Sequence, residues 1–443
     1  MIINMDRLIY QDLIDWKISD GRKPLMLEGA RQVGKTYLMK HFGRQEYEHF
    51  YYLSFDETPE ACSLFEGAKN AEAIIKKLST YFQTNIDPNN SLICIDEIQE
   101  CQDAITSLKY LCQDSPQYHV MTAGSLLGVK AKKESSFPVG YVTFRSLYPM
   151  SFLEFLNASG KNNLVELIAN LSIGEKLPEI FHNDLVQQLK TYYYIGGMPE
   201  GVAKYVKTSD FEKVRQIHKD ILRSYELDFT KHATPTEAAK ISLVWNSVPA
   251  QLAKENQKFI YSVIRPSARA REYENAIQWL IDANLILKCN KVIVPGVPLK
   301  AYANIDIFKT FMLDVGLMST MSRLTSKTLI EGNKLFTHHK GALSENYIAQ
   351  SLYQMVDDQL YYWASDGKAE LDFIFQNDEQ IIPVEVKSGR DKRKQSLRVY
   401  REKYNPKMAI RASLHQLDYD KNLLSIPLYA ISELKDFLEE VQK

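Results

Sequence analysis

The chain has 443 residues, of which 45% are hydrophobic and 25% are charged, and its formal net charge at pH 7 is −1. A chain of this length predicts two to four domains, each with a core of its own. A net charge close to zero excludes a general attraction to nucleic acid or to a membrane surface, although a local basic patch remains compatible with it.

The cysteines and the apolar segments do not have the patterns of a secreted or membrane-anchored protein. The five cysteines form no CxxC pair and no metal-ligand spacing, so we expect reduced thiols. Residues 1–16 alternate charged and apolar side chains, unlike a signal peptide. Apolar runs stay well below the ~20 residues needed to cross a bilayer. We therefore expect a cytoplasmic protein with no membrane partner.

The first motif in the chain is a phosphate-binding loop. Pro24–Glu28 has the pattern of a short buried strand, residues 29–36 (GARQVGKT) follow it directly, and a helical segment, Tyr37–Phe42, is expected to end at Gly43. This order of strand, loop and helix is the context that the GxxxxGK[ST] pattern requires. We predict that the loop binds ATP, with Lys35 on the β- and γ-phosphates and the Thr36 hydroxyl on Mg²⁺. The cofactor-binding residues of the loop are Gly29, Ala30, Arg31, Gln32, Val33, Gly34, Lys35 and Thr36.

A second motif lies about sixty residues further on. Ser91–Ile95 is an apolar strand that ends in Asp96 and Glu97. Ligands bind beyond the carboxyl ends of the strands in open α/β sheets, which is where these two carboxylates are expected. We predict that Asp96 holds Mg²⁺ through water and that Glu97 orients and deprotonates the attacking water.

The remaining strands and helices of the first 150 residues fit one sheet. The predicted strands are His49–Phe55, Tyr118–Ala123 and Tyr141–Leu147, and the predicted helices between them are Ala71–Gln83 and Ala104–Cys112. This alternation predicts an α/β fold, the doubly wound parallel sheet of a P-loop NTPase. Ser125 follows the second of these strands and is expected to sense the γ-phosphate.

Several sequence runs resemble those of a widespread group of bacterial and archaeal AAA+-type ATPases. The runs are GARQVGKT, LICIDEIQE, SLYPMSFLEF, YIGGMPE at residues 194–200 and FMLDVGL at residues 311–317, so the resemblance covers nearly the whole chain. In that group an ATPase domain precedes a C-terminal domain of unestablished function. The resemblance implies that Glu97 activates water and that Ser125 is the sensor.

This chain departs from the group at one position. The group usually has Gly-Arg before the last strand of the sheet, where the arginine is a plausible phosphate sensor, whereas this chain has Gly140 and Tyr141. Arg145 is the nearest arginine. The identity of an arginine finger is therefore open, and a ring, a dimer and a monomer are all compatible with the sequence.

The middle of the chain has a helical pattern. Residues 151–222 form amphipathic helices broken at Gly196 and Gly197, where we expect a tight inter-domain turn. Helical segments at 238–245, 251–254 and 268–283, followed by a β-wing at 285–294, predict a winged helix. Arg265, Arg269 and Arg271 lie near the start of its third helix, where a recognition helix contacts DNA. Winged helices also dock proteins, so DNA and a protein partner both remain open.

The last hundred residues carry a second set of charged groups. Leu371–Phe375 and Ile381–Lys387 predict a hairpin in which Asp372 approaches Glu385, with Lys387 on the same face. With Glu345 from the helix at 341–355, these residues form a possible second metal site and resemble the PD-(D/E)XK fold of restriction-type nucleases. The alternative is a solvated strand face in a fold without cleavage activity. A run of basic residues follows this hairpin. These residues either bind phosphate beside the predicted site or lie on the solvated face of a helix: Arg390, Lys392, Arg393, Lys394, Arg398 and Arg401.

The predicted domains are a P-loop ATPase domain at 1–160, a helical linker at 161–235, a winged-helix-like domain at 236–325 and a nuclease-like domain at 326–443. Two functions follow. In the first, a Mg²⁺-dependent ATPase couples hydrolysis to a C-terminal module directed at nucleic acid. In the second, a regulatory or scaffold ATPase carries an inactive nuclease-like fold that binds a protein partner.

Overall fold

The computed structural model describes residues 5–67, 70–125, 137–254, 258–328, 337–356, 359–365, 369–387 and 395–442. The chain divides into an N-terminal unit, Asp6–Tyr148, and a C-terminal unit built from Pro149–Ile281 and Leu285–Lys443. Each unit has its own sheet, and each is described by itself below.

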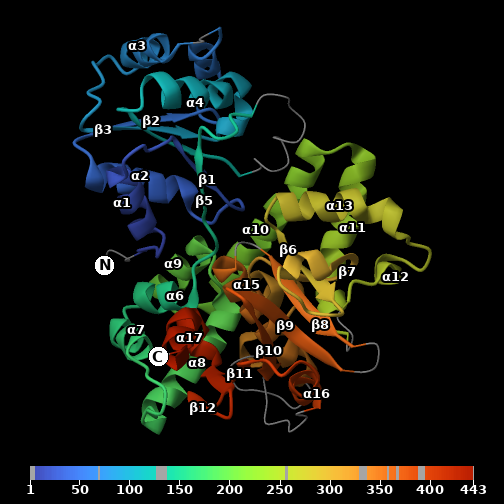
Figure 1. The fold of residues 1–443 in the computed structure, drawn as a ribbon. Coiled ribbons are helices and arrows are strands. Elements are labelled where there is room, and N and C mark those ends of the chain that lie inside the picture. Colours follow the sequence, from blue (N-terminus) through green and yellow to red (C-terminus); the bar gives the residue numbers. More distant parts are fainter. Residues whose placement is uncertain are drawn as a thin grey trace. The chain divides into compact units, whose positions relative to one another are not determined.

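The N-terminal unit is a five-stranded parallel sheet in the order β2-β3-β4-β1-β5. Helices cover both of its faces, with α1 and α2 on one side and α3 and α4 on the other (Figure 1). The predicted doubly wound sheet of a P-loop NTPase is therefore confirmed. The strands are β1 (Leu25–Glu28), β2 (His49–Ser54), β3 (Ser91–Asp96), β4 (His119–Ala123) and β5 (Thr143–Ser146), and the helices are α1 (Tyr10–Ile18), α2 (Lys35–Glu46), α3 (Ala71–Tyr81) and α4 (Gln102–Asp114).

Two expectations for this unit were wrong. Helix α2 does not end at Gly43 but continues to Glu46, and Gly43 makes room within the helix for the Phe50 ring. The expectation of reduced thiols fails for Cys62 and Cys101, which form a disulfide. Their Cα atoms lie 5.6 Å apart, a separation that a disulfide spans without strain on the backbone.

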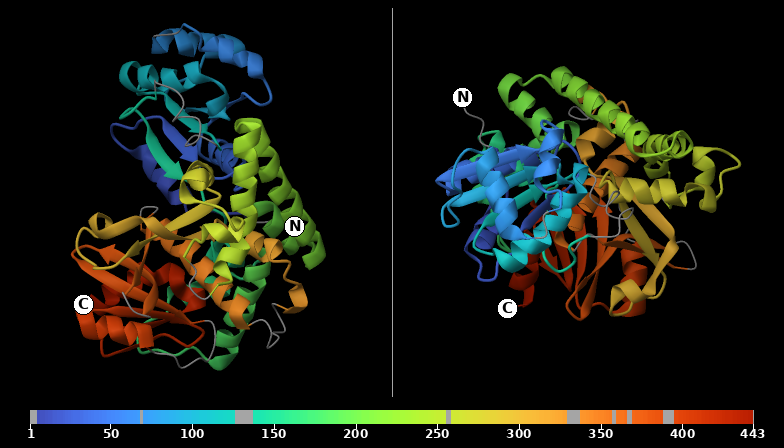
Figure 2. Two further views of the ribbon diagram at one scale, coloured as in Figure 1. Left: turned by 90° about the vertical axis from the view of Figure 1, so that its right-hand side faces the viewer. Right: turned by 90° about the horizontal axis from the view of Figure 1, so that it is seen from above.

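The helices of the C-terminal unit come before, between and after the strands of its sheet in the chain. The long helices α10 and α11 pack side by side (Figure 2). The predicted helical segment 238–245 and the first two residues of the segment 251–254 belong to one helix, α11. This helix begins with a capping box of Thr234 and Glu237 and accommodates Pro249 near its end. The helices are α6 (Phe152–Ala158), α7 (Asn162–Ala169), α8 (Glu179–Ile195), α9 (Pro199–Thr208), α10 (Phe211–His232), α11 (Pro235–Leu252), α12 (Tyr261–Ile264), α13 (Ala270–Asp282), α14 (Val315–Met321), α15 (Thr337–Met355), α16 (Gln395–Tyr404) and α17 (Leu434–Gln442).

The sheet of the C-terminal unit has eight strands, in the order β12-β13-β11-β10-β9-β8-β6-β7, with parallel and antiparallel neighbours. The predicted hairpin at residues 371–387 is confirmed as the antiparallel pair β9 and β10. The strands are β6 (Ile286–Val292), β7 (Ala303–Met312), β8 (Leu360–Ala364), β9 (Glu370–Asn377), β10 (Gln380–Lys387), β11 (Ala409–Ser413), β12 (Asp418–Asp420) and β13 (Leu423–Pro427).

The strand predicted as the wing, at residues 285–294, is β6, and it pairs with β8 as well as with β7. The eight-stranded sheet therefore runs across the predicted domain boundary at residues 325–326, and the four-part division of the chain stays a prediction. Arg265, Arg269 and Arg271 are exposed: Arg265 caps the end of α12, Arg269 directly precedes α13, and Arg271 lies in its first turn. In the basic segment, Arg390, Lys392, Arg393 and Lys394 lie outside the described residues.

The two faces of the eight-stranded sheet differ in chemistry. On one face Trp363 and Leu371 pack with Leu397 and Tyr400 of α16. Side chains alternate along a strand, so Asp372, next to Leu371, belongs to the opposite face. Helix α15 packs against β6, β7, β8 and β10. The charged residues predicted for the hairpin are therefore on the face that does not carry the α16 cluster.

Candidate functional site

The phosphate-binding loop joins the end of β1 to the start of α2, as the sequence predicts. Gly34 precedes the helix with a φ of 98°, and Gly29 opens the loop with a φ of 137°. A Cβ at Gly29 would lie 2.2 Å from the carbonyl oxygen of Leu147. The loop thus needs glycine at position 29 both for its backbone conformation and for its close approach to the segment after β5.

Lys35 lies inside this loop rather than on the surface. Its Nζ donates to the carbonyl oxygens of Gly29, at 2.9 Å, and of Ala30, at 2.7 Å. Burial lowers the pKa of Lys35 to about 8, Glu97 and Asp96 oppose that shift, and Arg31 adds to it. A desolvated ammonium at the N-terminus of a helix favours an anion such as a phosphate.

Asp96, at the end of β3, receives three hydrogen bonds. Thr36 donates its hydroxyl to Oδ2 at 2.6 Å, and Tyr52 donates its hydroxyl to the same atom at 2.9 Å. The backbone N–H of Glu97 donates to Oδ1 at 3.0 Å. A hydroxyl and a carboxylate held together in this way are the oxygen ligands that Mg²⁺ prefers, so the residues fit the predicted ion. Sequence reasoning missed Tyr52, because it lies on the neighbouring strand.

Glu97 follows Asp96 in a left-handed conformation, with φ 50° and ψ 43°. This backbone directs its side chain to two donors that share Oε2: the hydroxyl of Ser125, at 3.3 Å, and the amide of Gln99. Ser125 in turn accepts a hydrogen bond from Nε of Arg31 at 3.2 Å. The structure therefore brings the predicted residues Glu97 and Ser125 together with Arg31 of the phosphate-binding loop. It also adds Gln99, which the sequence analysis did not predict.

Arg7 is a further residue of this site that sequence reasoning missed. Its guanidinium donates to the carbonyl oxygen of Val33 at 2.9 Å and to that of Tyr148 at 2.5 Å. It is 8% exposed. Arg7 thus joins the phosphate-binding loop to the chain that leaves the sheet after β5. No local motif surrounds Arg7, so nothing in the sequence marks it.

Tyr141 and Arg145, the two positions that the sequence offered for a sensing arginine, both have partners outside the phosphate-binding loop. Tyr141 accepts a hydrogen bond from Gln113 at 3.2 Å, and the ammonium of Lys109 lies 5.5 Å from its ring. Arg145, on the edge strand β5, donates to the carbonyl oxygen of Phe144. Within the described residues, no hydrogen bond or ion pair joins Arg145 to the phosphate-binding loop.

The C-terminal unit contains a cluster of opposite charges on the sheet face that carries Asp372. Lys309 of β7 is 1% exposed, forms an ion pair with Glu370 at 2.7 Å and lies 4.7 Å from the Tyr362 ring. Although burial opposes its charge, the carboxylates of Glu370, Glu345 and Asp372 raise the pKa of Lys309. Sequence reasoning missed Lys309, which comes from a strand more than sixty residues away.

The residues predicted for the second metal site belong to this cluster. Glu385 is 3% exposed and lies 3.4 Å from Lys387 and 3.6 Å from Arg411. Asp372 accepts the N–H of Val386 at 2.6 Å, and burial raises its pKa although Lys309 opposes the shift. The hairpin therefore does bring Asp372, Glu385 and Lys387 to one place.

A three-carboxylate metal site is not assembled there. Glu345 of α15 acts on Lys309 through its charge. Across the part of the chain that the structure describes, however, no group of three or more histidine, cysteine, aspartate or glutamate side chains is arranged to hold a metal ion. Cationic side chains pair with the carboxylates instead. The pair Asp372 and Glu385 stays a prediction as a metal site.

The two remaining signature runs meet at Asp314. Its carboxylate, which is fully buried, accepts the N–H of Gly197 at 2.6 Å and the N–H of Leu317 at 2.9 Å. The carbonyl of Gly197 accepts the N–H of Met150 at 2.7 Å. The turn at Gly196 and Gly197 therefore lies inside the C-terminal unit and is fixed to the start of α14.

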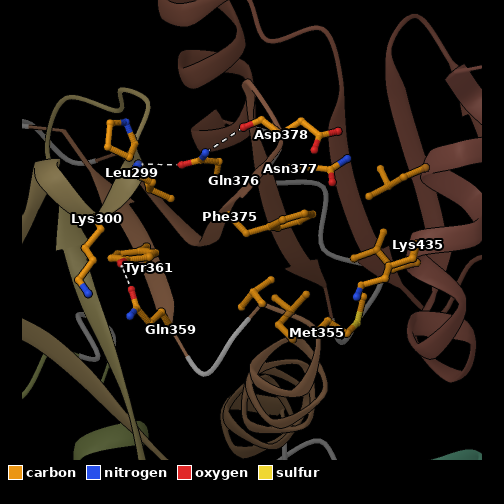
Figure 3. A pocket seen from close by; sticks show the side chains of 15 residues that line it. Leu299, Lys300, Met355, Gln359, Tyr361, Phe375, Gln376, Asn377, Asp378 and Lys435 are labelled. Carbon is orange, nitrogen blue, oxygen red and sulfur yellow. Dashed lines mark hydrogen bonds between the residues drawn. The ribbon is translucent and has the colours of Figure 1, made fainter. Parts of the chain in front are cut away.

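A cavity of about 390 Å³ lies in the C-terminal unit (Figure 3), and its lining does not include the residues of the charged cluster. Phe375, Tyr361 and Met355 supply its apolar walls. Two of its polar side chains are already engaged: Gln376 accepts the N–H of Leu299 at 2.9 Å, and Tyr361 donates to Gln359 at 2.6 Å. None of the residues predicted from the sequence as functional lines this cavity.

The fold and the site of the N-terminal unit define a P-loop NTPase. Comparison with known families agrees, since residues 21–156 match the model of a family described as an AAA domain. Residues 186–328 and 340–431 match two families described as domains of unknown function, DUF8612 and DUF4143. The match and the motif together support an ATP-binding ATPase of the AAA+ type. A search of the curated proteins finds no match to the chain.

Solved structures that resemble the chain include the Walker-type ATPase PABY2304 of Pyrococcus abyssi, with 15% identity, a TM-score of 0.44 and coverage of 72% of this chain and 96% of that one. Another is the Orc1 protein of Aeropyrum pernix in complex with DNA, with 12% identity, a TM-score of 0.26 and coverage of 71% and 90%. A third is the RuvB Holliday junction branch migration motor of Thermotoga maritima, with 11% identity, a TM-score of 0.29 and coverage of 64% and 89%. At these TM-scores the likenesses support no inference about function.

Among the described residues, no helix combines the length and the apolar character needed to cross a membrane.

Proposed function

We propose that this protein is a Mg²⁺-dependent ATPase in which Glu97 is the general base. The observation that carries the proposal is the meeting of the phosphate-binding loop with two carboxylates, through the hydrogen bond from Thr36 to Asp96 at 2.6 Å. Mg²⁺ held by these oxygens would neutralise charge on the phosphates.

The residues of the chain then have separate tasks in hydrolysis. Lys35 exchanges its two loop carbonyls for phosphate oxygens of ATP. Glu97 accepts a proton from the attacking water while the water oxygen bonds to the γ-phosphorus. The bond from that phosphorus to the bridging oxygen breaks, ADP leaves with the electron pair, and phosphate is released.

Two variants test this assignment by radiolabelled ATP binding and phosphate release. Lys35→Ala removes the phosphate contact, so binding should be lost. Glu97→Gln keeps the shape and removes the base, so ATP should bind as in the wild type while turnover falls by about 100-fold or more. Undiminished turnover in the glutamine variant contradicts the role of Glu97. A wild type without turnover, with and without DNA, contradicts the ATPase.

For the C-terminal unit we propose a module directed at nucleic acid and controlled by the ATPase. Support comes from the hairpin, which gathers Asp372, Glu385 and Lys387, the residue types of a phosphodiester-cleaving centre. Incubation with single- and double-stranded DNA and RNA, with Mg²⁺ or Mn²⁺ and with or without ATP, tests cleavage. Asp372→Ala is the control for a contaminating nuclease.

The alternative is a scaffold ATPase whose nuclease-like centre binds a protein partner without cutting nucleic acid. The ion pairs of Lys309, Lys387 and Arg411 favour it, because they already neutralise carboxylates that a metal would need. Intact nucleic acid under all the conditions above, together with ATP turnover that DNA does not change, supports this alternative.

A further inference from the structure

We infer that Arg31 is a positioning residue for ATP hydrolysis, which acts in cis by orienting the Ser125 hydroxyl towards the carboxylate of Glu97. The inference rests on the proposed ATPase function and deepens it. It assigns a catalytic positioning role to an arginine of the phosphate-binding loop, whereas the sequence left the identity of such an arginine open.

The hydroxyl of Ser125 has a single proton, whose direction is set by the partners of the oxygen. Nε of Arg31 donates to the serine oxygen at 3.2 Å, and arginine has no lone pair to accept in return. The hydroxyl proton of Ser125 is therefore turned away from Arg31. Its acceptor in the structure is Oε2 of Glu97, at 3.3 Å. Without Arg31 the hydroxyl is free to rotate to another acceptor.

The hydrogen bonds to Glu97 also determine which of its two carboxylate oxygens remains for the attacking water. Ser125 and Gln99 both donate to Oε2. Among the described residues neither of these donors bonds to Oε1, which leaves Oε1 to accept the proton of the attacking water. Two donors on one oxygen fix the plane of the carboxylate, and a general base must be held in a fixed position relative to its water.

Ser125 lies between the two nucleotide-binding motifs of the sheet. Ser125 follows β4, which lies between β1, with the phosphate-binding loop, and β3, with Asp96 and Glu97. The side chain is 3% exposed, so its hydroxyl depends on protein partners rather than on solvent. Arg31 is thus linked to the catalytic base through one buried hydroxyl.

Two other positions compete with Arg31 for this role. Tyr141 lies where the similar ATPases usually have an arginine, and its hydroxyl accepts a hydrogen bond from Gln113. Arg145 bonds to the backbone of Phe144. Arg31, by contrast, contacts Ser125 from within the same subunit, so the chain does not need an arginine from a neighbouring subunit to orient Glu97.

Steady-state ATPase assays of the full-length protein test the inference. Arg31→Ala should lower kcat by about 100-fold through misplacement of the base, with a KM change within about threefold. Arg31→Lys, which keeps a donor, should recover part of kcat. Arg44→Ala is the matched control, since Arg44 is an exposed arginine of α2. Arg145→Ala is the competing variant and should leave kcat within about twofold.

Two further measurements separate positioning from a general loss of structure. Arg31→Ala and Ser125→Ala act through one chain of hydrogen bonds, so the double variant should be no slower than the slower single variant. Arg31→Ala keeps the backbone N–H groups of the phosphate-binding loop, so it should bind ADP within about threefold of the wild type. It should bind ADP with aluminium fluoride more weakly, because only that complex needs an oriented Glu97.

The outcomes that overturn the inference differ from those that overturn the ATPase. If the wild type hydrolyses ATP and Glu97→Gln does not, but Arg31→Ala keeps its kcat, the inference is wrong and the function stands. The same holds if mixing Arg31→Ala with Lys35→Ala protein restores turnover, since the arginine would then act between subunits. Additive losses in the double variant also contradict it. Absence of turnover in the wild type instead removes the proposed function.

Discussion

Asp314 offers the sharpest test of how the two signature runs stabilise the C-terminal unit. The carboxylate is fully buried and accepts the N–H groups of Gly197 and Leu317, at 2.6 Å and 2.9 Å. The second of these bonds caps α14. In Asp314→Ala both N–H groups lose their acceptor, so the turn at Gly197 is released from the start of the helix.

The magnitude follows from two opposing contributions. Two hydrogen bonds to a charged acceptor stabilise the fold by about 3–6 kcal/mol together. Burial, however, raises the pKa of Asp314 from 3.8 to about 6, which corresponds to roughly 3 kcal/mol against the ionised form. The difference between these contributions is about 0–3 kcal/mol, so the alanine variant should lose up to about 3 kcal/mol at pH 7.

The sign of the pH dependence follows from the same pKa. Because the folded pKa lies above the unfolded value of 3.8, the folded state binds more protons between these two values. The wild type is thus stabilised by this group at low pH and loses that stabilisation as pH rises through about 6. The difference between wild type and Asp314→Ala should accordingly be about 1.4 kcal/mol larger at pH 5 than at pH 7.

Urea unfolding followed by tryptophan fluorescence measures this difference. Trp245, Trp279 and Trp363 belong to the C-terminal unit, and Trp16→Phe removes the signal of the N-terminal unit. ATP binding should persist in Asp314→Ala, since the loop lies in the other unit. A variant clearly more stable than the wild type at pH 7, or a stability difference that does not change between pH 7 and pH 5, would refute the reasoning.

Three further outcomes are expected. Lys35→Met should abolish ATP binding. In the wild type the buried ammonium deprotonates at a lower pH in the folded state than in the unfolded state, so the free energy of unfolding should rise by roughly 3 kcal/mol between pH 8 and pH 10.5. The variant should lack this rise, and parallel pH–stability curves for variant and wild type would contradict the expectation. Lys309→Met leaves Glu370, 30% exposed, without its cation, so chemical denaturation should show a loss of about 2–3 kcal/mol, and a loss below about 1 kcal/mol would argue against the ion pair. Gly29→Ala places a Cβ 2.2 Å from the carbonyl oxygen of Leu147 and should weaken ATP binding more than tenfold, whereas Gly21→Ala, which shares a positive φ but meets no atom within 4 Å, should leave the affinity unchanged.

The parts of the site that the sequence predicted are those encoded within one segment. The phosphate-binding loop is a continuous run between a strand and a helix, and Asp96 and Glu97 directly follow an apolar strand. Parallel strands carry such residues to one edge of the sheet whatever the rest of the chain does. This is why the order of elements in the first 150 residues sufficed for the fold of the unit.

The parts that the sequence did not predict depend on contacts between distant segments. Tyr52 reaches Asp96 from the neighbouring strand, and Arg7 reaches Val33 from a segment without a motif. Lys309 joins Glu370 although the two belong to strands that are not neighbours in the sheet. The sequence shows the type of each residue but not its partner. The partner depends on the order of the strands in the sheet, and the alternation of side chains along a strand does not specify that order.

The two groups of carboxylates differ in their partners, and this difference bears on which chemistry each can support. The hydrogen bonds to Asp96 and Glu97 come from neutral donors: the hydroxyls of Thr36, Tyr52 and Ser125, the amide of Gln99 and one backbone N–H. Neutral donors orient a carboxylate without cancelling its charge, and a divalent ion and a water proton both require that charge. In the C-terminal unit, Glu370 and Glu385 are instead paired with lysine or arginine.

A paired carboxylate attracts a metal ion less strongly, because the ion must first displace a cation already in contact. Metal binding at Asp372 and Glu385 thus requires the ammonium of Lys387 or the guanidinium of Arg411 to move away from Glu385. A phosphate of bound nucleic acid is a partner that could draw these cations away. If the C-terminal centre cleaves, its affinity for Mn²⁺ should therefore rise when DNA is bound. If it serves as a scaffold, the ion pairs stay closed, and DNA should leave Mn²⁺ binding in an Asp96→Asn background unchanged.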